Sequence, residues 1–319
     1  MFKKSFAALA VLGFCASYAN ASSVILYGVV DEALVFTHEK FDVTGEEGTK
    51  TNTFGLESGL NAPSRFGLRG VEDLGNGLQV SFVAENSFSA DDGSLGMGRL
   101  FGRELSATVS GDFGRVSLGR MGGVGSSAVN RYASAALTGD FGALQTVLAY
   151  EFQNYQSFGT DVNPSVEDGH TVYLGGNYDF GVTRLFAMAQ YFKGLSATQL
   201  TAIADETRAE TADNMWSDGA KGYGLHLGTV TPVFGGDFTA GLYFVDAKFQ
   251  NGANAANQND ADLSYYGAAL RYGYPLSKRT TVYTGVGYGV SKLEFNNNGQ
   301  DVEAKNQVGQ AYLGLTHMF

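Results

Sequence analysis

The sequence contains one cysteine, Cys15, and only four prolines among its 319 residues. Cys15 falls in an N-terminal segment that we expect to be removed, so the mature chain has no thiol for a disulfide or a thiolate metal site. Beyond that segment there is no apolar stretch of about 18 residues, the length that a membrane-spanning helix requires. These absences exclude a disulfide-bonded scaffold and a helical membrane protein.

The removable segment is predicted at residues 1–21. Two lysines precede a short apolar run at 6–16, and the Ala-Asn-Ala sequence that ends at Ala21 is a small-x-small cleavage site. A lipoprotein anchor is disfavoured because Phe14 is too large for the position before the modified cysteine. We therefore expect a secretory signal peptide at 1–21 and a single mature domain at 22–319.

Basic residues are also scarce. The chain has 21 lysines and arginines against 32 aspartates and glutamates, which gives a net charge of −11. Binding to nucleic acid needs clustered lysines and arginines, so nucleic acid is excluded as a partner. The acidic clusters fall in polar stretches between strand-like runs, as solvated loops do.

No arrangement of residues points to catalysis. The four histidines lie in separate segments without the spacing of metal ligands, and the motifs of outer-membrane phospholipases and proteases are not found. Glycine runs at 67–75 and 285–289 are not followed by a helix, so they do not predict a nucleotide site. We expect no enzyme, no catalytic residue, no metal and no cofactor.

What the chain has in abundance is glycine and aromatic residues, with 44 Gly, 17 Tyr and 23 Phe. Apolar residues recur with a period of two in the last segment, where Ala311, Leu313, Leu315 and Phe319 share one face of a strand. In the segment 280–295 the opposite face is small and polar, too poorly packed for a protein core. This pattern is typical of a transmembrane antiparallel β-barrel with a water-filled lumen.

The connections between these segments are sorted by length. Short turns are expected near 111–114, 138–142, 179–181, 234–237 and 276–280, and long polar connections at 153–169, 194–222, 250–262 and 296–305. Outer-membrane barrels have short periplasmic turns and long external loops. The sequence therefore predicts a multi-pass protein of the Gram-negative outer membrane, in contact with outer-membrane lipid, with 194–222 outside the cell.

Counting the segments gives fourteen strands, an even number that can close. They are expected at 24–37, 60–72, 78–89, 100–111, 115–121, 129–138, 142–153, 170–180, 182–193, 222–233, 237–249, 262–275, 280–295 and 307–319.

Several segments resemble one known family. The block SRFGLRGVEDLGNGL at 64–78 is similar to the second strand, turn and third strand of betaproteobacterial-type porins. The LYGVVD sequence at 26–31 resembles their first strand, 111–120 their fourth and fifth, and 276–280 their last periplasmic turn. On this resemblance the chain is identified as a member of the Gram-negative general porin family.

The resemblance implies a homotrimer of 16-stranded barrels, each a passive aqueous channel for ions and small hydrophilic solutes. It also implies that the terminal Phe319 is read by the barrel-insertion machinery and that the third external loop folds into the lumen. This chain departs from the pattern, because only Met121 to Ala128 is available for that loop and the count is two strands short. Residues 198–214 are rich in helix formers and either cover the mouth or, as the favoured alternative, form an exposed external helix.

Strand parity predicts which residues line the pore. If Phe66 and Leu68 face lipid, Arg65 and Arg69 face the lumen, because arginine is costly against lipid. The residues expected to line the pore are Arg65, Arg69, Glu85, Gln145, Arg184, Gln190, Arg271, Tyr27 and Asp31. By the same parity Arg103 and Arg120 fall with apolar residues, so they are expected at a rim or beside a bulge.

Two functions remain open from the sequence. The first is a passive diffusion channel, in which width and charge discriminate among solutes. The second is a surface adhesion or interaction protein that acts through its external loops. Solute flux through the reconstituted protein separates them, because an adhesin need not conduct.

Overall fold

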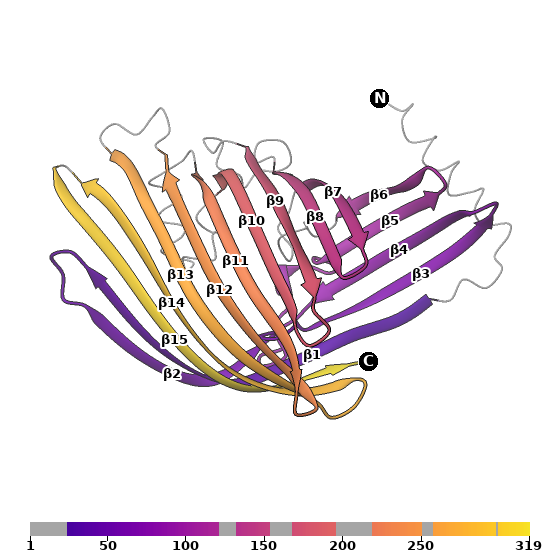
Figure 1. The fold of residues 1–319 in the computed structure, drawn as a ribbon, viewed down its shortest axis with the longest axis horizontal. Coiled ribbons are helices and arrows are strands. Elements are labelled where there is room, and N and C mark those ends of the chain that lie inside the picture. The colour runs from indigo at the N-terminus through magenta and orange to yellow at the C-terminus, as the bar shows by residue number, and fades with distance from the viewer. Residues whose placement is uncertain (1–23, 121–131, 154–167, 196–218, 251–257, 298) are drawn as a thin grey trace.

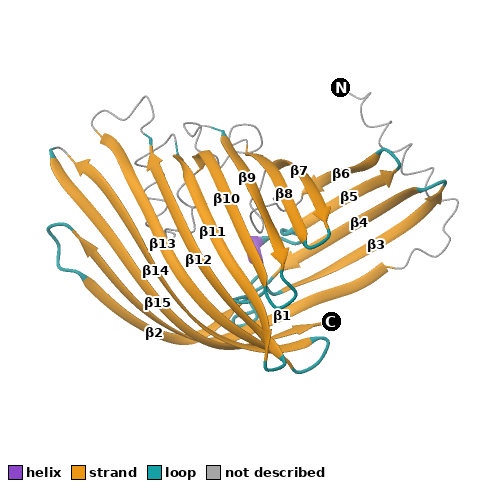
Figure 2. Cartoon of the chain, in the orientation of Figure 1, coloured by secondary structure: helices purple, strands orange, loops and turns teal. Residues whose placement is uncertain are grey.

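The computed structural model describes residues 24–120, 132–153, 168–195, 219–250, 258–297 and 299–319. These residues are almost entirely antiparallel strand (Figure 2), which confirms the expected all-β fold. The helical element among them is a single 3₁₀ turn, η2 (Gly96–Gly98). The expected signal peptide lies outside the described residues, as do residues 121–128 and 198–214.

Fifteen strands are described. They are β1 (Val24–Val43), β2 (Thr49–Ser58), β3 (Arg65–Gly75), β4 (Leu78–Ser87), β5 (Glu104–Gly111), β6 (Gly114–Arg120), β7 (Tyr132–Phe141), β8 (Leu144–Gln153), β9 (Gly169–Asp179), β10 (Arg184–Leu195), β11 (Ala220–Val233), β12 (Gly236–Phe249), β13 (Gln258–Pro275), β14 (Thr280–Asn297) and β15 (Gln300–Met318).

The strands form one curved sheet in which most strands pair with the next one in sequence (Figure 1). The first and last strands also pair: β1 runs antiparallel to β15 from the Val29–Met318 pair to the Val43–Ala304 pair. The path ends at β6 on one side and at β7 on the other, and no pairing between these two strands is found among the described residues. This continuous sheet places the first and last described strands, β1 and β15, side by side within it.

The position next to β1, on the side away from β15, is shared by two strands. β1 pairs with β2 from Glu32 to Phe41 and with β3 from Val24 to Val29. Fifteen strands therefore occupy fourteen positions, and the expected count of fourteen omitted β2. Its residues TKTNTFGLES are mostly polar, and six of the first eight positions of this strand carry no large apolar side chain, so no alternation marks it as a strand.

Another expectation was wrong. Residues 296–305 were predicted as a long polar connection, but β14 and β15 continue to the Asn297–Gln300 pair and reverse at Gly299, which has a φ of +88°. Charged residues hold this end of the ladder together: Lys292 Nζ lies 2.8 Å from Glu294 Oε1 and 3.0 Å from Glu303 Oε2. Polarity in the sequence marked the end of the apolar surface rather than the end of the strands.

The connections differ in length at the two ends of the strands, as expected. Two-residue turns follow β3, β5, β7 and β11 at one end. The turn after β3 has positive φ at both Asn76 and Gly77, which is the hairpin turn that an Asn-Gly pair favours. At the other end the connections include 88–103 after β4 and 196–219 after β10.

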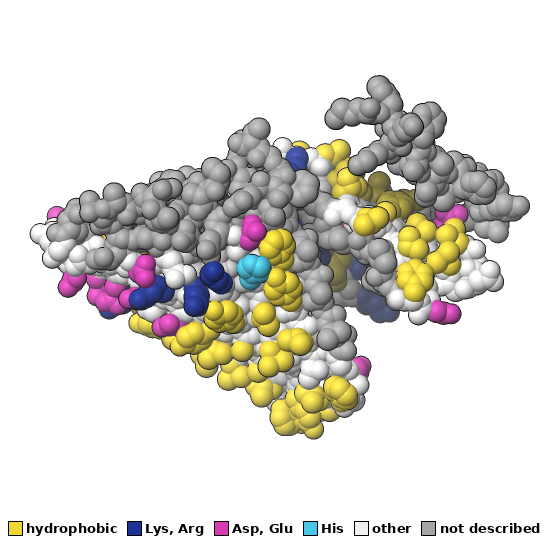
Figure 3. Space-filling view, turned by 90° about the horizontal axis from the view of Figure 1, so that it is seen from above, with side chains coloured by type: hydrophobic (Ala, Val, Ile, Leu, Met, Phe, Trp, Pro, Cys, Tyr) yellow, Lys and Arg dark blue, Asp and Glu magenta, His cyan; other side chains and the backbone are white. Residues whose placement is uncertain are grey.

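The two faces of the sheet differ in chemistry. We call them the Tyr27 face and the Leu26 face. Each consists of the named residue of β1, every second residue along that strand, and the residues on the other strands that the pairings place on the same side of the sheet. On the Leu26 face, large apolar side chains are exposed on almost every strand, among them Leu34, Phe36, Leu174, Leu225, Leu242, Leu270, Val286 and Leu313. Figure 3 shows hydrophobic side chains over a broad area, with charged side chains gathered at its margin.

Candidate functional site

All nine residues expected to line the pore lie on the Tyr27 face. The register pairs Tyr27 with Gly67, which lies between Arg65 and Arg69 on β3, and pairs Gly67 with Glu85 on β4. In the other direction, Asp31 on β1 pairs with Thr316 on β15. The pairings from β15 to β14 and from β14 to β13 then place Gly285 and its partner Arg271 on the same face. Further along the sheet, Arg184, Gln190 and Gln145 are on the same face by the pairings of β8 to β13.

Four of the nine form one charged cluster. Glu85 accepts a hydrogen bond of 2.9 Å from the Tyr27 hydroxyl through Oε2. The same carboxylate lies 3.5 Å from Arg65 Nε and 2.5 Å from Arg103 Nε. Arg69 completes the cluster, with its guanidinium carbon 5.1 Å from the centre of the Tyr27 ring, within the range of a cation–π contact. Glu104 on β5 pairs with Glu85 in the register and adds a second carboxylate. The cluster therefore has three guanidinium groups against two carboxylates, which leaves an excess of one positive charge.

Gly67 makes room for this cluster. A Cβ atom at this position would lie 2.8 Å from the Tyr27 ring, closer than real contacts allow. The ring can therefore lie along the sheet and carry its hydroxyl to Glu85 only because β3 has no side chain there. The glycine of the SRFGLRG block has a packing role that the sequence did not reveal.

Arg103 was expected at a rim or beside a bulge rather than among the pore-lining residues, and it belongs to this cluster. Parity put it with apolar residues, but it precedes β5 and lies outside the alternation of that strand. Its backbone N–H donates to the Glu85 carbonyl at 3.2 Å, which directs its side chain toward the carboxylate of the same residue. No strand pattern could predict this contact. The side chain of Arg120 is outside the described part of the chain.

A second cluster surrounds Asp31, which has no exposed surface. Its carboxylate accepts hydrogen bonds from the Tyr283 hydroxyl at 2.8 Å, from the Asn61 backbone N–H at 3.0 Å and from the Thr316 hydroxyl. Asp31 is on the expected face, but its burial contradicts the expectation that it lines a water-filled space. A buried carboxylate requires such donors, because an unpaired charge away from water is very costly.

Arg271 adjoins the Asp31 cluster. Its guanidinium carbon lies 5.3 Å from the centre of the Tyr283 ring, and Tyr283 meets Tyr312 edge-on at 5.9 Å between ring centres. Glycines again make room, since a Cβ at Gly314 would overlap the Tyr283 ring and one at Gly285 would overlap the Tyr312 hydroxyl. The rings of Tyr283 and Tyr312 therefore pack over Gly314 and Gly285, and the Tyr283 ring contacts the Arg271 guanidinium.

The remaining predicted residues lie apart from both clusters. Gln145 accepts a hydrogen bond of 3.2 Å from Asn177, and Arg184 pairs with Asp179 at 2.8 Å beside a turn. Both partners of that ion pair are exposed, so it contributes little to stability. Gln190 lies against Gly224 of the neighbouring strand.

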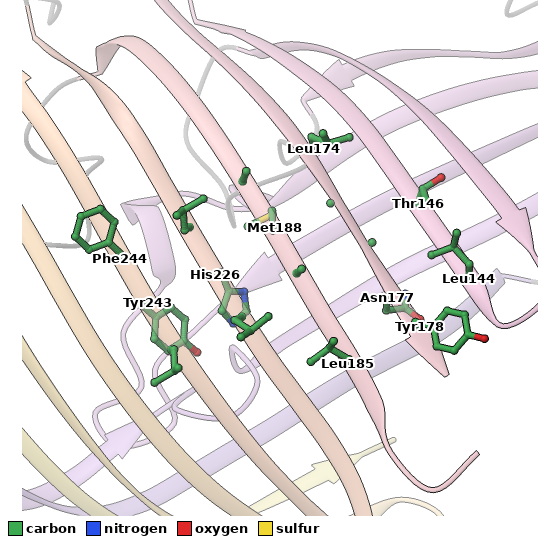
Figure 4. Close-up of a pocket in the computed structure, with 17 residues that line it drawn as sticks. Leu144, Thr146, Leu174, Asn177, Tyr178, Leu185, Met188, His226, Tyr243 and Phe244 are labelled. Carbon is green, nitrogen blue, oxygen red and sulfur yellow. The ribbon is translucent and has the colours of Figure 1, made fainter. Parts of the chain in front are cut away.

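A depression of about 670 Å³ lies over β8 to β12 (Figure 4). Its lining is mainly apolar, and His226 stacks on Tyr243 with 4.6 Å between ring centres. It contains no acid–base pair or nucleophile arranged for catalysis. Among the described residues, no group of three His, Cys, Asp or Glu could hold a metal ion. No helix in the described ranges has the length and apolar character needed to cross a membrane.

Comparison with known proteins gives concordant matches. The sequence pattern that describes the Gram-negative porin family matches residues 8–132. An outer membrane porin protein of Bordetella pertussis is 27% identical over 365 residues, covering 88% of this chain and 92% of that protein. Outer membrane porin protein 32 of Delftia acidovorans is 28% identical over 326 residues, covering 88% of each.

Solved structures show the same fold. An anion-selective porin from Comamonas acidovorans superposes with a TM-score of 0.57 at 21% identity, covering 94% of this chain and all of that one. The trimer form of OmpT, an outer membrane protein of Vibrio cholerae, gives a TM-score of 0.52 at 14% identity, with 94% and 100% covered.

Proposed function

This chain belongs to the Gram-negative porin family, and from that premise we propose that its Tyr27 face lines the channel. The protein is an outer-membrane porin, through which ions and small hydrophilic solutes diffuse passively. Family membership does not favour the alternative of an adhesin. The observation that carries the assignment of the lining is the contrast between the faces: arginines on one, exposed large apolar side chains on the other.

Energetics support this orientation. An arginine at the lipid midplane costs about 2–4 kcal/mol, whereas the exposed leucines of the Leu26 face gain free energy there. Turning the sheet the other way would put Arg65, Arg69 and Arg271 against lipid and the leucines in water. The lumen is therefore assigned to the Tyr27 face.

We further propose that Arg69 and Arg271 supply most of the attraction for anions. Arg65 and Arg103 share the Glu85 carboxylate, so their charges are partly cancelled. Arg69 and Arg271 instead face tyrosine rings, and neither is in an ion pair with a described carboxylate. A fixed charge on a narrow aqueous path raises the local concentration of the opposite ion.

The assembly follows from the family in the same way. We propose a homotrimer in the outer membrane, formed after removal of a signal peptide at 1–21 and after recognition of Phe319 by the barrel-insertion machinery. Porins are channels rather than enzymes, and the proposal contains no catalytic step, metal or cofactor.

The test is a planar-bilayer recording of the purified protein under a KCl gradient. We expect stepwise conductance and a zero-current potential of the sign that marks an anion preference. A protein that inserts, shown by heat-modifiable electrophoretic mobility, but never conducts would be an interaction protein instead. A cation preference would refute the role given to Arg69 and Arg271 while leaving the channel itself intact.

A further inference from the structure

The connection between β2 and β3 is too long for the distance it spans. We call this segment, Gly59–Ser64, the strap. While β1 advances from Val29 to Glu32, its partner changes from Arg65 to Ser58. Three steps along a strand cover about 10 Å, but the strap could reach about 20 Å if extended. The strap must therefore leave the plane of the sheet.

The contacts of the strap show on which side it leaves. The Asn61 backbone N–H donates to Asp31 Oδ1 at 3.0 Å, and its side-chain amide donates to the Thr316 hydroxyl at 2.7 Å. Leu60 packs against the buried cluster of Ala33, Val35 and Tyr283. These partners all belong to the Tyr27 face, so the strap lies on the side assigned to the lumen.

The strap is fastened at both ends. At its start the Gly59 backbone N–H donates to the Asp31 carbonyl at 2.9 Å. Ser64 donates from its hydroxyl to the Asp31 carbonyl at 3.1 Å and accepts from the Asp31 backbone N–H at 3.0 Å. Arg65 donates through Nη1 to the Pro63 carbonyl at 2.9 Å. The strap thus joins the cluster around Glu85 to the cluster around Asp31.

Burial beneath the strap is nearly complete. Asp31, Ala33, Val35 and Tyr283 have at most 2% of their surface exposed. A second buried group on the same face, around Phe192, Phe249 and Leu263, lies on β10, β12 and β13 and is separate from the strap. The outer side of the strap is accessible, with Asn61 and Pro63 exposed and Ala62 half-buried. A fixed segment with one side anchored and the other in solvent narrows the space in front of the wall.

We propose that the strap is a constriction of the channel and that it determines which solutes pass. This inference rests on the proposed function, since it needs the lumen on the Tyr27 face. The strap lies between Arg65 on one side and Tyr283 on the other, and the Arg271 guanidinium lies against the Tyr283 ring. Solutes passing these arginines are therefore forced close to them. Asp31 acts as a positioning residue, which holds the strap and does not meet the solute.

The test places a thiol on the strap. The mature chain has no cysteine, so Ala62→Cys can be labelled specifically, and it removes no side-chain hydrogen bond. Purified protein in a planar bilayer is treated with a cationic and, separately, an anionic methanethiosulfonate reagent. We expect conductance to fall by roughly one third or more with either reagent, because each adds bulk at the constriction. The zero-current potential should move toward anion preference with the cationic reagent and toward cation preference with the anionic one.

The control is Phe113→Cys, in the exposed turn after β5, which should be labelled without a change in current. Mass spectrometry measures labelling in both variants. An Ala62→Cys thiol that fails to react, or that reacts without changing conductance, overturns the constriction. Failure of the unmodified protein to conduct would instead refute the proposed channel, so the two failures are distinguishable.

Discussion

Gly28 and Phe319 exchange a pair of backbone hydrogen bonds, each 3.1 Å long, and the Phe319 ring covers the space where a Gly28 side chain would stand. A Cβ at Gly28 would overlap ring atom Cζ. The terminal residue is therefore seated on the first strand, at the point where β1 and β15 begin to pair.

Gly28→Val should displace the Phe319 ring and weaken this seam. We expect a several-fold loss of folded protein in the outer membrane, measured by heat-modifiable mobility on gels. The control is Gly309→Ala, on β15, where a Cβ has no neighbour closer than 3.7 Å. Equal yields for the two variants would show that packing of the Phe319 ring against Gly28 does not affect folding into the outer membrane.

Arg69→Gln and Arg271→Gln should each reduce the ratio of chloride to potassium permeability, by roughly twofold, because each removes a fixed charge from the lumen wall. Arg65→Gln should have a smaller effect, since Glu85 already offsets that charge. The measurement is the zero-current potential under a KCl gradient, with Arg184→Gln beside the turn as the control. A larger effect from Arg65 than from Arg69 would reverse this ranking.

Glu85→Gln should act in the opposite direction. It leaves Arg65 and Arg103 without their shared carboxylate while the Tyr27 hydroxyl keeps an amide oxygen to bond. The ratio of chloride to potassium permeability should therefore rise, most clearly at low salt where screening is weakest. Unaltered selectivity would mean that solutes do not approach this cluster.

Asp31→Ala should destabilise the barrel strongly. The substitution leaves buried donors of Tyr283, Thr316 and Asn61 without an acceptor, and each buried donor left unpaired costs about 1–3 kcal/mol. Urea unfolding of the protein in detergent, followed by tryptophan fluorescence or gel mobility, measures the loss. The exposed Asp262→Ala is the control and should change stability by about 0.5 kcal/mol or less. Similar midpoints for both would contradict the role of Asp31.

The orientation can be tested with described residues at opposite ends of the strands. Glu46→Cys, in the connection after β1, should react with an impermeant maleimide on intact cells, whereas Ser277→Cys, in the turn after β13, should react only after the outer membrane is broken. The reverse result would turn the barrel over in the membrane.

The sequence predicted most of the sheet because lipid imposes a strict pattern. On β13 to β15 apolar residues recur at every second position over much of each strand and the others are small or polar, so both strand and face could be assigned. The alternation of apolar residues is lost in the parts of strands that do not contact lipid. β2 is polar along much of its length, and residues 296–305 continue as strand beyond the apolar surface.

The clusters could not be predicted in the same way. Parity placed Tyr27, Arg65, Arg69 and Glu85 on one face, but the contacts among them depend on register, which the sequence did not provide. Asn61 and Thr316 are 255 residues apart, and no local pattern links them. The burial of Asp31 follows from that distant contact, so it too was missed.

The strands differ greatly in length around the sheet. β13, β14 and β15 have 18, 18 and 19 residues, while β5 and β6 have 8 and 7. A tilted strand crosses the hydrocarbon layer in about 9–11 residues, so the long strands rise well beyond it and the short ones do not. The charged rung of Lys292, Glu294 and Glu303 lies on that raised part. The strand part of the wall is therefore uneven, and a large particle such as an antibody that approaches over β13 to β15 meets strand well above the lipid.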